Sequence, residues 1–481
     1  MNLSIIRYIL GRVLQFLGVF LLLPVIVSLI YREFNNTGLI FLAVAAVSFI
    51  LCTVSSFFKP KNNAFYAREG FVTVSLSWIL LSFVGAVPFV LTGEIPHIID
   101  AVFETVSGFT TTGASILSDV EAMSQTAMFW RCFTNWIGGM GVLVFIMAIL
   151  PLSGSYNMHL MRAESTGPSV GKLVPRVKNT AKILYGIYLG LTLVLIVSYM
   201  CAGMKLYDAL IISFSTMGTG GFANLNASLG GYSHAAQVVS IIFMILCGIN
   251  FNAYFLIISR KPKEFFKIEE VRWYLIILFM AAAAITVQIR GSYGSIYSAA
   301  HDATFQVVSI MTTTGFSVTD FNTWPMFSKT ILLMLMVIGG CAGSTSGGIK
   351  VSRLLILFRT LGKEASHLTH PRSVKKMRLN GQTVVEETSK SVYSFLIAYV
   401  VVLMVSVLIV SADGFDFTTS FTSVLSMLGN VGPGLSVVGP AGNYSGFSDL
   451  SKITLFIDML AGRLEIFPMM VLFYFGTWKR G

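Results

Sequence analysis

Charged residues are scarce in this sequence: only 11% of its 481 residues are Asp, Glu, Lys or Arg. A soluble domain carries roughly 25% charged residues because its surface faces water. The scarcity therefore excludes a soluble globular protein, and the 55% hydrophobic content excludes a disordered one. A chain of this length can hold about ten membrane helices and no large domain outside the bilayer.

Cysteine pairs and catalytic motifs are also lacking. The five cysteines form no CxxC pair and lie in or beside apolar stretches, where a thiol acts as a small buried hydrophobe. The six histidines are scattered, and neither HExxH nor GxSxG with a suitable histidine partner occurs. We therefore expect no enzyme, no disulfide, no metal centre built from cysteine or histidine, and no cofactor held by this chain.

Long apolar runs bounded by charged residues are what the sequence does contain. They lie at about 9–31, 39–58, 71–93, 126–151, 182–203, 236–259, 273–289, 327–358, 391–412 and 452–477. Each is long enough for a helix that crosses the membrane. The first run has no small-residue cleavage site and a second follows closely, so we expect the two to remain as a hairpin.

Lys and Arg are unevenly distributed between alternate loops. The two termini and the stretches after the second, fourth, sixth and eighth runs hold 25 of the 33 basic residues, whereas the opposite loops are acidic. By the positive-inside rule both termini are cytoplasmic, in a multi-pass protein of the cell (inner, plasma) membrane. Anionic membrane lipid is the expected partner of this basic surplus, because no basic helix with interleaved aromatic residues indicates nucleic acid.

A short motif, Ser-x-x-[Thr/Gly]-x-x-Gly, occurs four times, each time in an outer loop between two apolar runs. Its copies SGFTTTG, STMGTGG, SIMTTTG and SMLGNVG end 108, 94 and 117 residues apart, at Gly113, Gly221, Gly315 and Gly432. Three copies follow an Asp-Ala pair that starts at Asp100, Asp208 or Asp302, and we expect each Asp to cap a short helix. Such a helix spans only about 20 Å and must re-enter the face it left.

The repeating unit is therefore span, half-helix, Thr/Gly loop, span. We expect an all-α polytopic membrane protein with four parallel span/pore-helix/span repeats in pseudo-fourfold arrangement around a central pore, plus an extra N-terminal transmembrane hairpin. The expected bounds are 1–60 for the hairpin and 61–160, 161–262, 263–365 and 366–481 for the repeats. Each unit contains two full spans, so all four keep one orientation.

The Thr/Gly loops are candidates for a cation filter. Irregular backbone at membrane depth is tolerated where it lines a water-filled path, and rings of carbonyls replace the water shell of a monovalent cation. Glycine permits a positive φ and leaves the lumen clear, and the half-helices aim their negative dipole ends at the same point. The loops carry no carboxylate, which argues against a divalent-cation site.

This plan resembles the superfamily of potassium transporters, and the N-terminal hairpin and the fourth loop NVGPGL (430–435) resemble its TrkH family over essentially the whole chain. The resemblance implies that potassium, the transported ion, binds at Thr111, Thr112, Gly113, Thr219, Gly220, Gly221, Thr313, Thr314, Gly315, Asn430, Val431 and Gly432. The TVGYG of tetrameric potassium channels is absent from every repeat, which leaves the potassium-to-sodium ratio open.

The eighth apolar run is too long for one span, since 328–359 would form a helix of about 48 Å. Its middle, GGCAGSTSGG, is rich in glycine, and each helical glycine costs about 1 kcal/mol relative to alanine. We expect a loop over 339–348 that crosses the pore beneath the filter, and the TrkH resemblance implies an intramembrane gating loop. The candidate gate residues are Gly339, Gly340, Gly343, Ser344, Thr345, Ser346, Gly347 and Gly348.

Arg463 is the remaining gate candidate, because an arginine inside a span is costly unless it is paired or lines a cavity. Two roles stay open: a structural partner of Asp458, Glu465 or the gating-loop carbonyls, or a positive barrier that faces the pore. The TrkH resemblance favours the barrier. The roles of Lys350, Asp458 and Glu465 are not fixed by the sequence.

The sequence thus predicts potassium-selective, channel-like uptake across the cell membrane. The alternative is a potassium or sodium symporter coupled to protons or sodium, which needs a titratable carboxylate near the midplane, and only Asp458 and Glu465 lie there. The TrkH resemblance further implies a homodimer and a separate cytosolic ring, TrkA-like, that binds NAD or adenine nucleotides. Such a ring would dock on the basic loops around 152–182 and 353–390.

Overall fold

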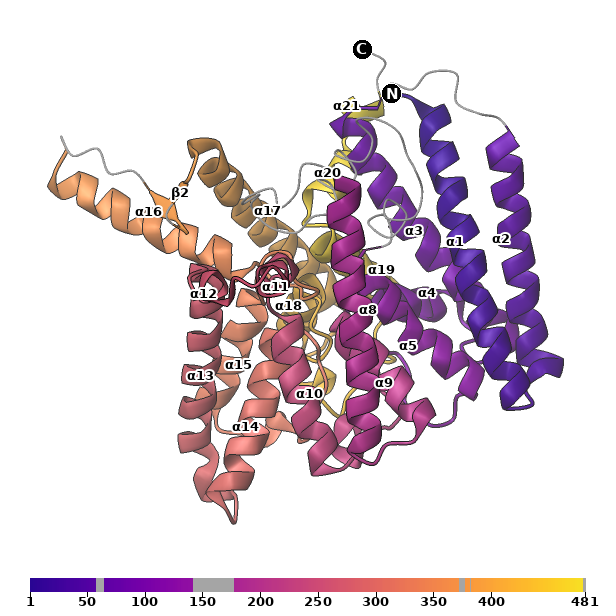
Figure 1. Ribbon diagram of the computed structural model, residues 1–481, viewed down its shortest axis with the longest axis horizontal. Coiled ribbons are helices and arrows are strands. Elements are labelled where there is room, and N and C mark those ends of the chain that lie inside the picture. Colours follow the sequence, from indigo (N-terminus) through magenta and orange to yellow (C-terminus); the bar gives the residue numbers. More distant parts are fainter. Residues whose placement is uncertain (58–64, 142–176, 372–376, 381, 479–481) are drawn as a thin grey trace.

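The computed structural model describes residues 1–57, 65–141, 177–371, 377–380 and 382–478, and this part of the chain is mainly helical (Figure 1). Six of its helices are long and apolar enough to cross a membrane, or seven if one bent pair counts as a span. They are α1 (Leu3–Ile30), α2 (Leu39–Phe57), α3 (Ala67–Thr92), α8 (Val177–Cys201), α13 (Glu269–Ile289) and α17 (Glu386–Val410). The chain is therefore a multi-pass helical membrane protein, as predicted.

Apolar side chains cover the outside of these helices. Phe279 in α13 and Leu408 in α17 are each 74% exposed, while polar residues such as Thr73 and Ser77 of α3 are fully buried. This inverted surface suits contact with lipid. The described residues contain two strands, which form the small hairpin β1 (Arg378–Leu379) and β2 (Gln382–Thr383).

Four short helices precede the Thr/Gly loops, as the motif predicts. They are α4 (Ile98–Phe109), α9 (Leu206–Gly218), α14 (Ile296–Met311) and α18 (Phe417–Gly429). The prediction that Asp100, Asp208 and Asp302 cap the first three is wrong, because α4 begins after His97, α9 after Lys205 and α14 after Ser295.

These three carboxylates bind side chains instead. Asp100 accepts from Lys452 Nζ at 2.6 Å, Asp208 from Asn224 Nδ2 at 2.9 Å and Asp302 from the Tyr293 hydroxyl at 3.0 Å. Aspartate does cap α18, where Asp416 accepts from the Thr419 amide at 3.1 Å. That repeat has no Asp-Ala pair, so the pair is not a capping signal.

The helices that follow the Thr/Gly loops are short or broken. They are α5 (Gln125–Gly139), α10 (His234–Cys247) with α11 (Phe251–Ile258), α15 (Met326–Ile338) with α16 (Val351–Thr369), and α19 (Asp449–Arg463) with α20 (Phe467–Phe473). The predicted break at 339–348 is confirmed. The expectation of continuous spans at 236–259 and 452–477 is wrong: α10 and α11 meet at 94°, and the chain leaves the helix at 464–466, where Glu465 and Ile466 have positive φ.

Several predicted features lie outside the described residues. These are residues 142–151 of the run 126–151, most of the basic loop 152–182, residues 372–376 and 381 of the basic loop 353–390, and the boundaries at 60/61 and 160/161. The structure therefore describes the first repeat only as far as residue 141.

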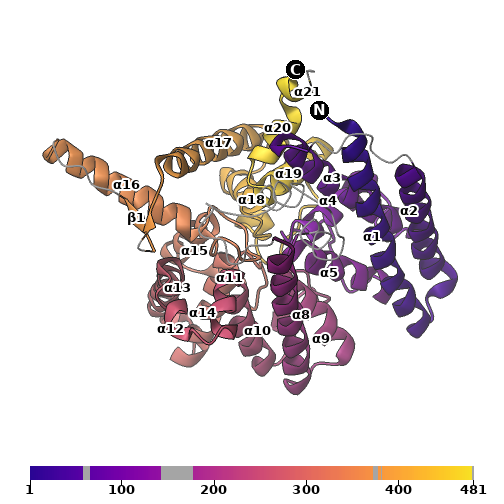
Figure 2. The same cartoon turned by 45° about the horizontal axis from the view of Figure 1, so that its top comes forward.

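The helices of successive repeats contact one another in a closed cycle. Helix α5 packs against α9, α10 against α14, α15 against α18, and α19 returns to α4. The N-terminal hairpin of α1 and α2 lies outside this cycle, where α1 packs on α3 and α5. At the opposite end of the chain, α21 (Phe475–Trp478) lies near the beginning of α1 (Figure 2).

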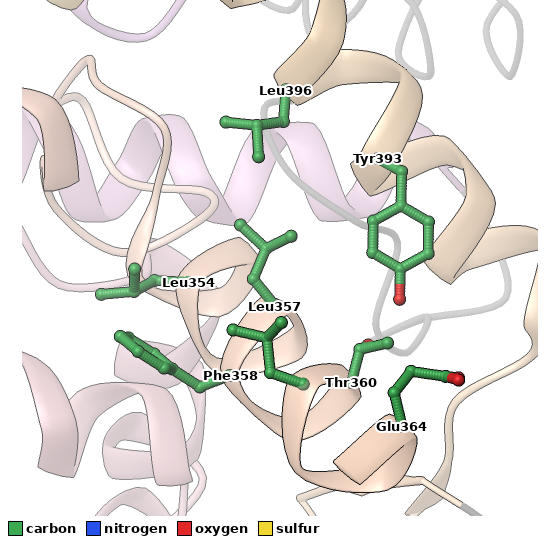
Figure 3. A pocket seen from close by; sticks show the side chains of 8 residues that line it. Leu354, Leu357, Phe358, Thr360, Glu364, Tyr393 and Leu396 are labelled. Carbon is green, nitrogen blue, oxygen red and sulfur yellow. The ribbon is translucent and has the colours of Figure 1, made fainter. Parts of the chain in front are cut away.

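Helix α16 projects sideways from the bundle (Figures 1 and 2). Side chains of α16 and α17 line a groove between the two helices. The groove has a volume of about 600 Å³, and Figure 3 shows side chains that line it. Its lining is mainly apolar and includes Leu354, Leu357, Phe358, Leu361, Tyr393 and Leu396. Helix α16 begins at Val351, directly after the Gly/Ser loop of residues 339–350. This helix therefore links the surface of the molecule to its centre. The short α12 (Pro262–Phe265) precedes α13 and lies near the end at which α13 begins (Figure 1).

Candidate functional site

All four half-helices end in the same turn. The first or second residue after each helix adopts a left-handed conformation with φ between 53° and 56°. These residues are Thr111, Thr219, Thr313 and Asn430. The next amide then donates to the carbonyl of the motif serine at 2.8–2.9 Å, from Thr112 to Ser107, Gly220 to Ser215, Thr314 to Ser309 and Val431 to Ser426. Because this bond closes the helix C-terminus, the motif fixes where each loop leaves its helix.

The final glycine of each motif lies against the loop of the following repeat. A Cβ atom built on Gly113 would lie 2.2 Å from the carbonyl oxygen of Gly220, and one on Gly221 would lie 2.0 Å from that of Thr314. Glycine is required here because φ is positive and a methyl group would strike a neighbouring carbonyl.

The same relation continues to the third and fourth repeats and back to the first. A Cβ on Gly315 would lie 2.2 Å from the Val431 carbonyl oxygen, and one on Gly432 would lie 2.6 Å from that of Thr112. The four loops therefore form a closed ring, and all twelve predicted loop residues lie in it.

A buried ion pair supports the ring behind its first two loops. Arg131 Nε donates to Glu104 Oε1 at 2.6 Å, and Glu104 also accepts from the Ile116 amide at 3.0 Å. Arg131 Nη1 reaches the carbonyl of Ala223 at 3.0 Å, and its guanidinium lies 3.7 Å from the centre of the Phe222 ring. The pair thus joins the segments that follow Gly113 and Gly221.

The Gly/Ser loop, residues 339–350, lies directly against this ring. The Gly347 amide donates to the side-chain oxygen of Thr313 at 2.6 Å, and the Gly348 amide donates to the Gly429 carbonyl at 3.0 Å. A Cβ on Gly347 would lie 2.2 Å from that carbonyl oxygen, so only glycine permits the approach. The Gly/Ser loop therefore contacts Thr313 of the third Thr/Gly loop and the last residue of α18, which precedes the fourth.

The other end of the Gly/Ser loop is held by the second repeat. The Cys341 amide donates to the Gly248 carbonyl at 2.9 Å, and the Thr345 hydroxyl donates to the Cys247 carbonyl at 3.3 Å. These acceptors are the last carbonyls of α10, which the bend before α11 leaves free. The bend between α10 and α11, which the sequence did not reveal, therefore supplies the carbonyls that hold the Gly/Ser loop.

Arg463 joins the Gly/Ser loop to the first repeat. Its Nη1 donates to the Thr345 carbonyl at 2.6 Å, and its Nη2 donates to the carbonyls of Gly138 and Gly139. The side chain is 8% exposed. These contacts match the structural alternative, in which Arg463 binds loop carbonyls.

The two carboxylates near Arg463 have other partners. Asp458 accepts from the Ser406 hydroxyl at 2.8 Å, and Glu465 forms an ion pair with Arg353 of α16. Neither contact involves Arg463, so these contacts do not support the alternative in which Arg463 pairs with Asp458 or Glu465.

Comparisons with known proteins show the family to which the chain belongs. The family model TrkH, described as cation transport protein, matches residues 37–476. A Trk system potassium uptake protein TrkH from Vibrio parahaemolyticus is 37% identical over 99% of both chains, and one from Escherichia coli K12 is 36% identical over the whole of both. The chain belongs to the TrkH family.

The structure of a TrkH family member has the same fold. The crystal structure of the potassium transporter TrkH from Vibrio parahaemolyticus superposes with a TM-score of 0.89 and covers 100% of both chains at 34% identity. The predicted family is therefore confirmed, and this TrkH family member is a transporter and not an enzyme.

Glu270, which the sequence did not single out, holds the first part of the Gly/Ser loop and the first turn of α16 in this TrkH family chain. Glu270 is 5% exposed, and its Oε1 accepts from the amides of Ala342 at 2.7 Å and Ser352 at 3.1 Å. The available signal was a pair of acids, Glu269 and Glu270, at the start of an apolar run in an otherwise basic region.

Lys350 closes the Gly/Ser loop just before α16. It has a φ of 85° and its side chain is buried. Its Nζ donates to the carbonyl of Ser346 within the loop. We interpret Lys350 as an internal brace of the loop, a role that its sequence position alone did not indicate.

Proposed function

We propose that this TrkH family chain carries potassium across the cell membrane by a channel-like uptake mechanism. The proposed path runs through a central pore with four repeats in pseudo-fourfold arrangement, at about the bounds 61–160, 161–262, 263–365 and 366–481. The relatives from Vibrio parahaemolyticus and Escherichia coli, both named as potassium uptake proteins, support potassium as the ion.

The closed ring of Thr/Gly loops is the observation that carries this proposal. Each final glycine lies against the carbonyl of the residue that precedes the equivalent glycine in the next repeat. A Cβ atom placed on each glycine would lie only 2.0–2.6 Å from that carbonyl oxygen. Repeated left-handed turns leave these carbonyls outside helical hydrogen bonding, so they are available to a cation. The ring carries no carboxylate, which favours a monovalent over a divalent ion.

The Gly/Ser loop is the proposed gate. It lies under the ring through Gly347 and Gly348, and Arg463 holds it at Thr345. In this position the loop and the guanidinium obstruct a cation that leaves the ring. Opening requires the loop to break these hydrogen bonds, and α16, which continues from the loop to the surface, is the element that can transmit a regulatory signal.

The coupled symporter is less well supported. Coupling to protons or sodium needs a carboxylate that exchanges its partner during transport, yet Asp458 binds Ser406 and Glu465 binds Arg353. Neither contact involves a residue of the Thr/Gly ring. We therefore favour uncoupled flux, which reverses at the potassium equilibrium potential whatever the pH gradient.

The remaining proposals concern placement and partners. We place both termini in the cytoplasm of a cell inner membrane, on the positive-inside argument. A homodimer and a cytosolic, TrkA-like ring that binds NAD or adenine nucleotides are proposed as partners, and the name Trk system given to the relatives supports the idea of a multi-component assembly.

Ion flux into liposomes tests the function. Purified protein is reconstituted, and the uptake of potassium, rubidium, sodium and lithium is compared under the same gradient. We expect potassium and rubidium to enter well ahead of sodium and lithium. Equal rates for potassium and sodium would contradict the assignment of the ring as a filter.

A further inference from the structure

The fourth loop of the ring differs from the others in one hydrogen bond. The carbonyl oxygen of Gly432 accepts from the hydroxyl of Tyr444 at 2.9 Å. Within the part of the chain that the structure describes, no donor approaches the equivalent carbonyls of Gly113, Gly221 and Gly315. One of the four glycine carbonyls is therefore held by a side chain, and three are not.

Tyr444 is itself rigidly placed. It lies in the segment between the fourth loop and α19, is 2% exposed, and donates its own amide to the Ser115 carbonyl of the first repeat at 2.9 Å. Its ring packs between Phe103 and Phe447, with ring centres 5.6 and 5.5 Å away. Because backbone and ring are both fixed, the hydroxyl has a fixed position relative to Gly432.

The fourth loop has a particular need for this support. Gly432 has a φ of 98°, whereas the other three glycines lie between 70° and 81°. Proline follows it at position 433, where the other repeats have Ala114, Phe222 and Phe316. Proline has no amide hydrogen, so position 433 offers the loop no backbone donor.

We propose that Tyr444 is a specificity-determining residue: its hydroxyl fixes the Gly432 carbonyl so that the ring keeps the spacing that suits potassium. This inference rests on the proposed potassium function. Sodium is smaller than potassium, so its coordination requires carbonyls to move inward. A released Gly432 carbonyl can make that movement, and the penalty against sodium falls.

The test compares Tyr444→Phe with the wild type in reconstituted full-length protein. Loss of one neutral hydrogen bond is expected to lower the potassium-to-sodium flux ratio roughly 2- to 10-fold while potassium flux stays near its original rate. Tyr399→Phe is the matched control, because Tyr399 is also buried but its hydroxyl has no hydrogen-bond partner among the described residues. Its flux ratio should not change.

A second variant separates the hydroxyl from the ring packing. Phe447→Leu removes one of the two aromatic contacts and keeps the hydroxyl and its bond to Gly432, so it should lower the melting temperature and lower the flux ratio much less than Tyr444→Phe does. An equal fall of the ratio in Phe447→Leu, or an unchanged ratio in Tyr444→Phe, would overturn the role of the hydroxyl. A wild type without potassium preference would overturn the proposed function itself, so the two failures are distinguishable.

Discussion

Substitution of Arg463 by alanine is the sharpest perturbation of the proposed gate. Of its contacts, the bond from Nη1 to the Thr345 carbonyl joins it to the Gly/Ser loop, while the bonds to Gly138 and Gly139 join it to the first repeat. A hydrogen bond from a charged group contributes about 1.5–3 kcal/mol. Loss of the Thr345 bond therefore favours the displaced loop by roughly 10- to 100-fold, since 1.4 kcal/mol is tenfold.

The assay is potassium leak from liposomes that contain the purified protein without any regulatory partner. We expect Arg463→Ala to raise the leak by that factor. Arg463→Lys keeps the positive charge but loses the planar fork that reaches three carbonyls. If the lysine variant leaks as little as the wild type, the positive charge is what keeps the gate closed. If it leaks as much as the alanine variant, the hydrogen bonds of the guanidinium keep the gate closed. An alanine variant with the leak of the wild type would refute the gate role of Arg463.

Four further outcomes follow from the contacts. Gly113→Ala should abolish potassium preference because its Cβ meets the Gly220 carbonyl, whereas Gly93→Ala, with a similar φ of 79° and open space, should only lower the melting temperature. Gly347→Ala should keep the Gly/Ser loop from approaching the Gly429 carbonyl, so the basal potassium leak should rise. Potassium flux from liposomes without a regulatory partner measures this leak. Glu270→Ala leaves two buried amides without an acceptor, so it should lower the free energy of unfolding by about 2–6 kcal/mol. Glu270→Gln keeps an oxygen acceptor and should lower it by less. Thermal unfolding in detergent compares the two variants. Hydrogen bonds from Thr419 lower the pKa of Asp416. The Asp416 cap of α18 therefore stabilises the folded protein fully at pH values above the ordinary carboxyl pKa, and this stabilisation is lost as the pH falls through the lowered pKa. The melting temperature of Asp416→Ala should therefore lie below the wild type at neutral pH and converge with it in acid.

The motifs that the sequence predicted are those with a composition unlike their surroundings. Repeated Ser-x-x-x-x-x-Gly segments interrupt apolar runs, and the structure places all four in one ring through contacts such as that of Gly113 with Gly220. The Gly/Ser stretch at 339–348 was recognisable for the same reason, because five glycines in ten residues disfavour a helix.

What the sequence did not reveal depends on contacts between distant segments. The bend between α10 and α11 lies in an apolar run, and it becomes useful only because Gly248 and Cys247 meet the Gly/Ser loop. Glu270 and Tyr444 each act on residues more than ten positions away, at Ala342 and Gly432. The Asp-Ala pairs led to a wrong capping prediction, because their carboxylates bind side chains from other parts of the chain instead of capping helices.

The central claim is that the four carbonyl-lined loops bind the transported ion, and rubidium in place of potassium makes that site visible. An anomalous difference map from crystals grown in rubidium locates bound ions directly. We predict a peak on the axis enclosed by the carbonyl oxygens of Thr112, Gly220, Thr314 and Val431. An empty ring, with rubidium bound instead beside Asp458 or Glu465, would contradict the account.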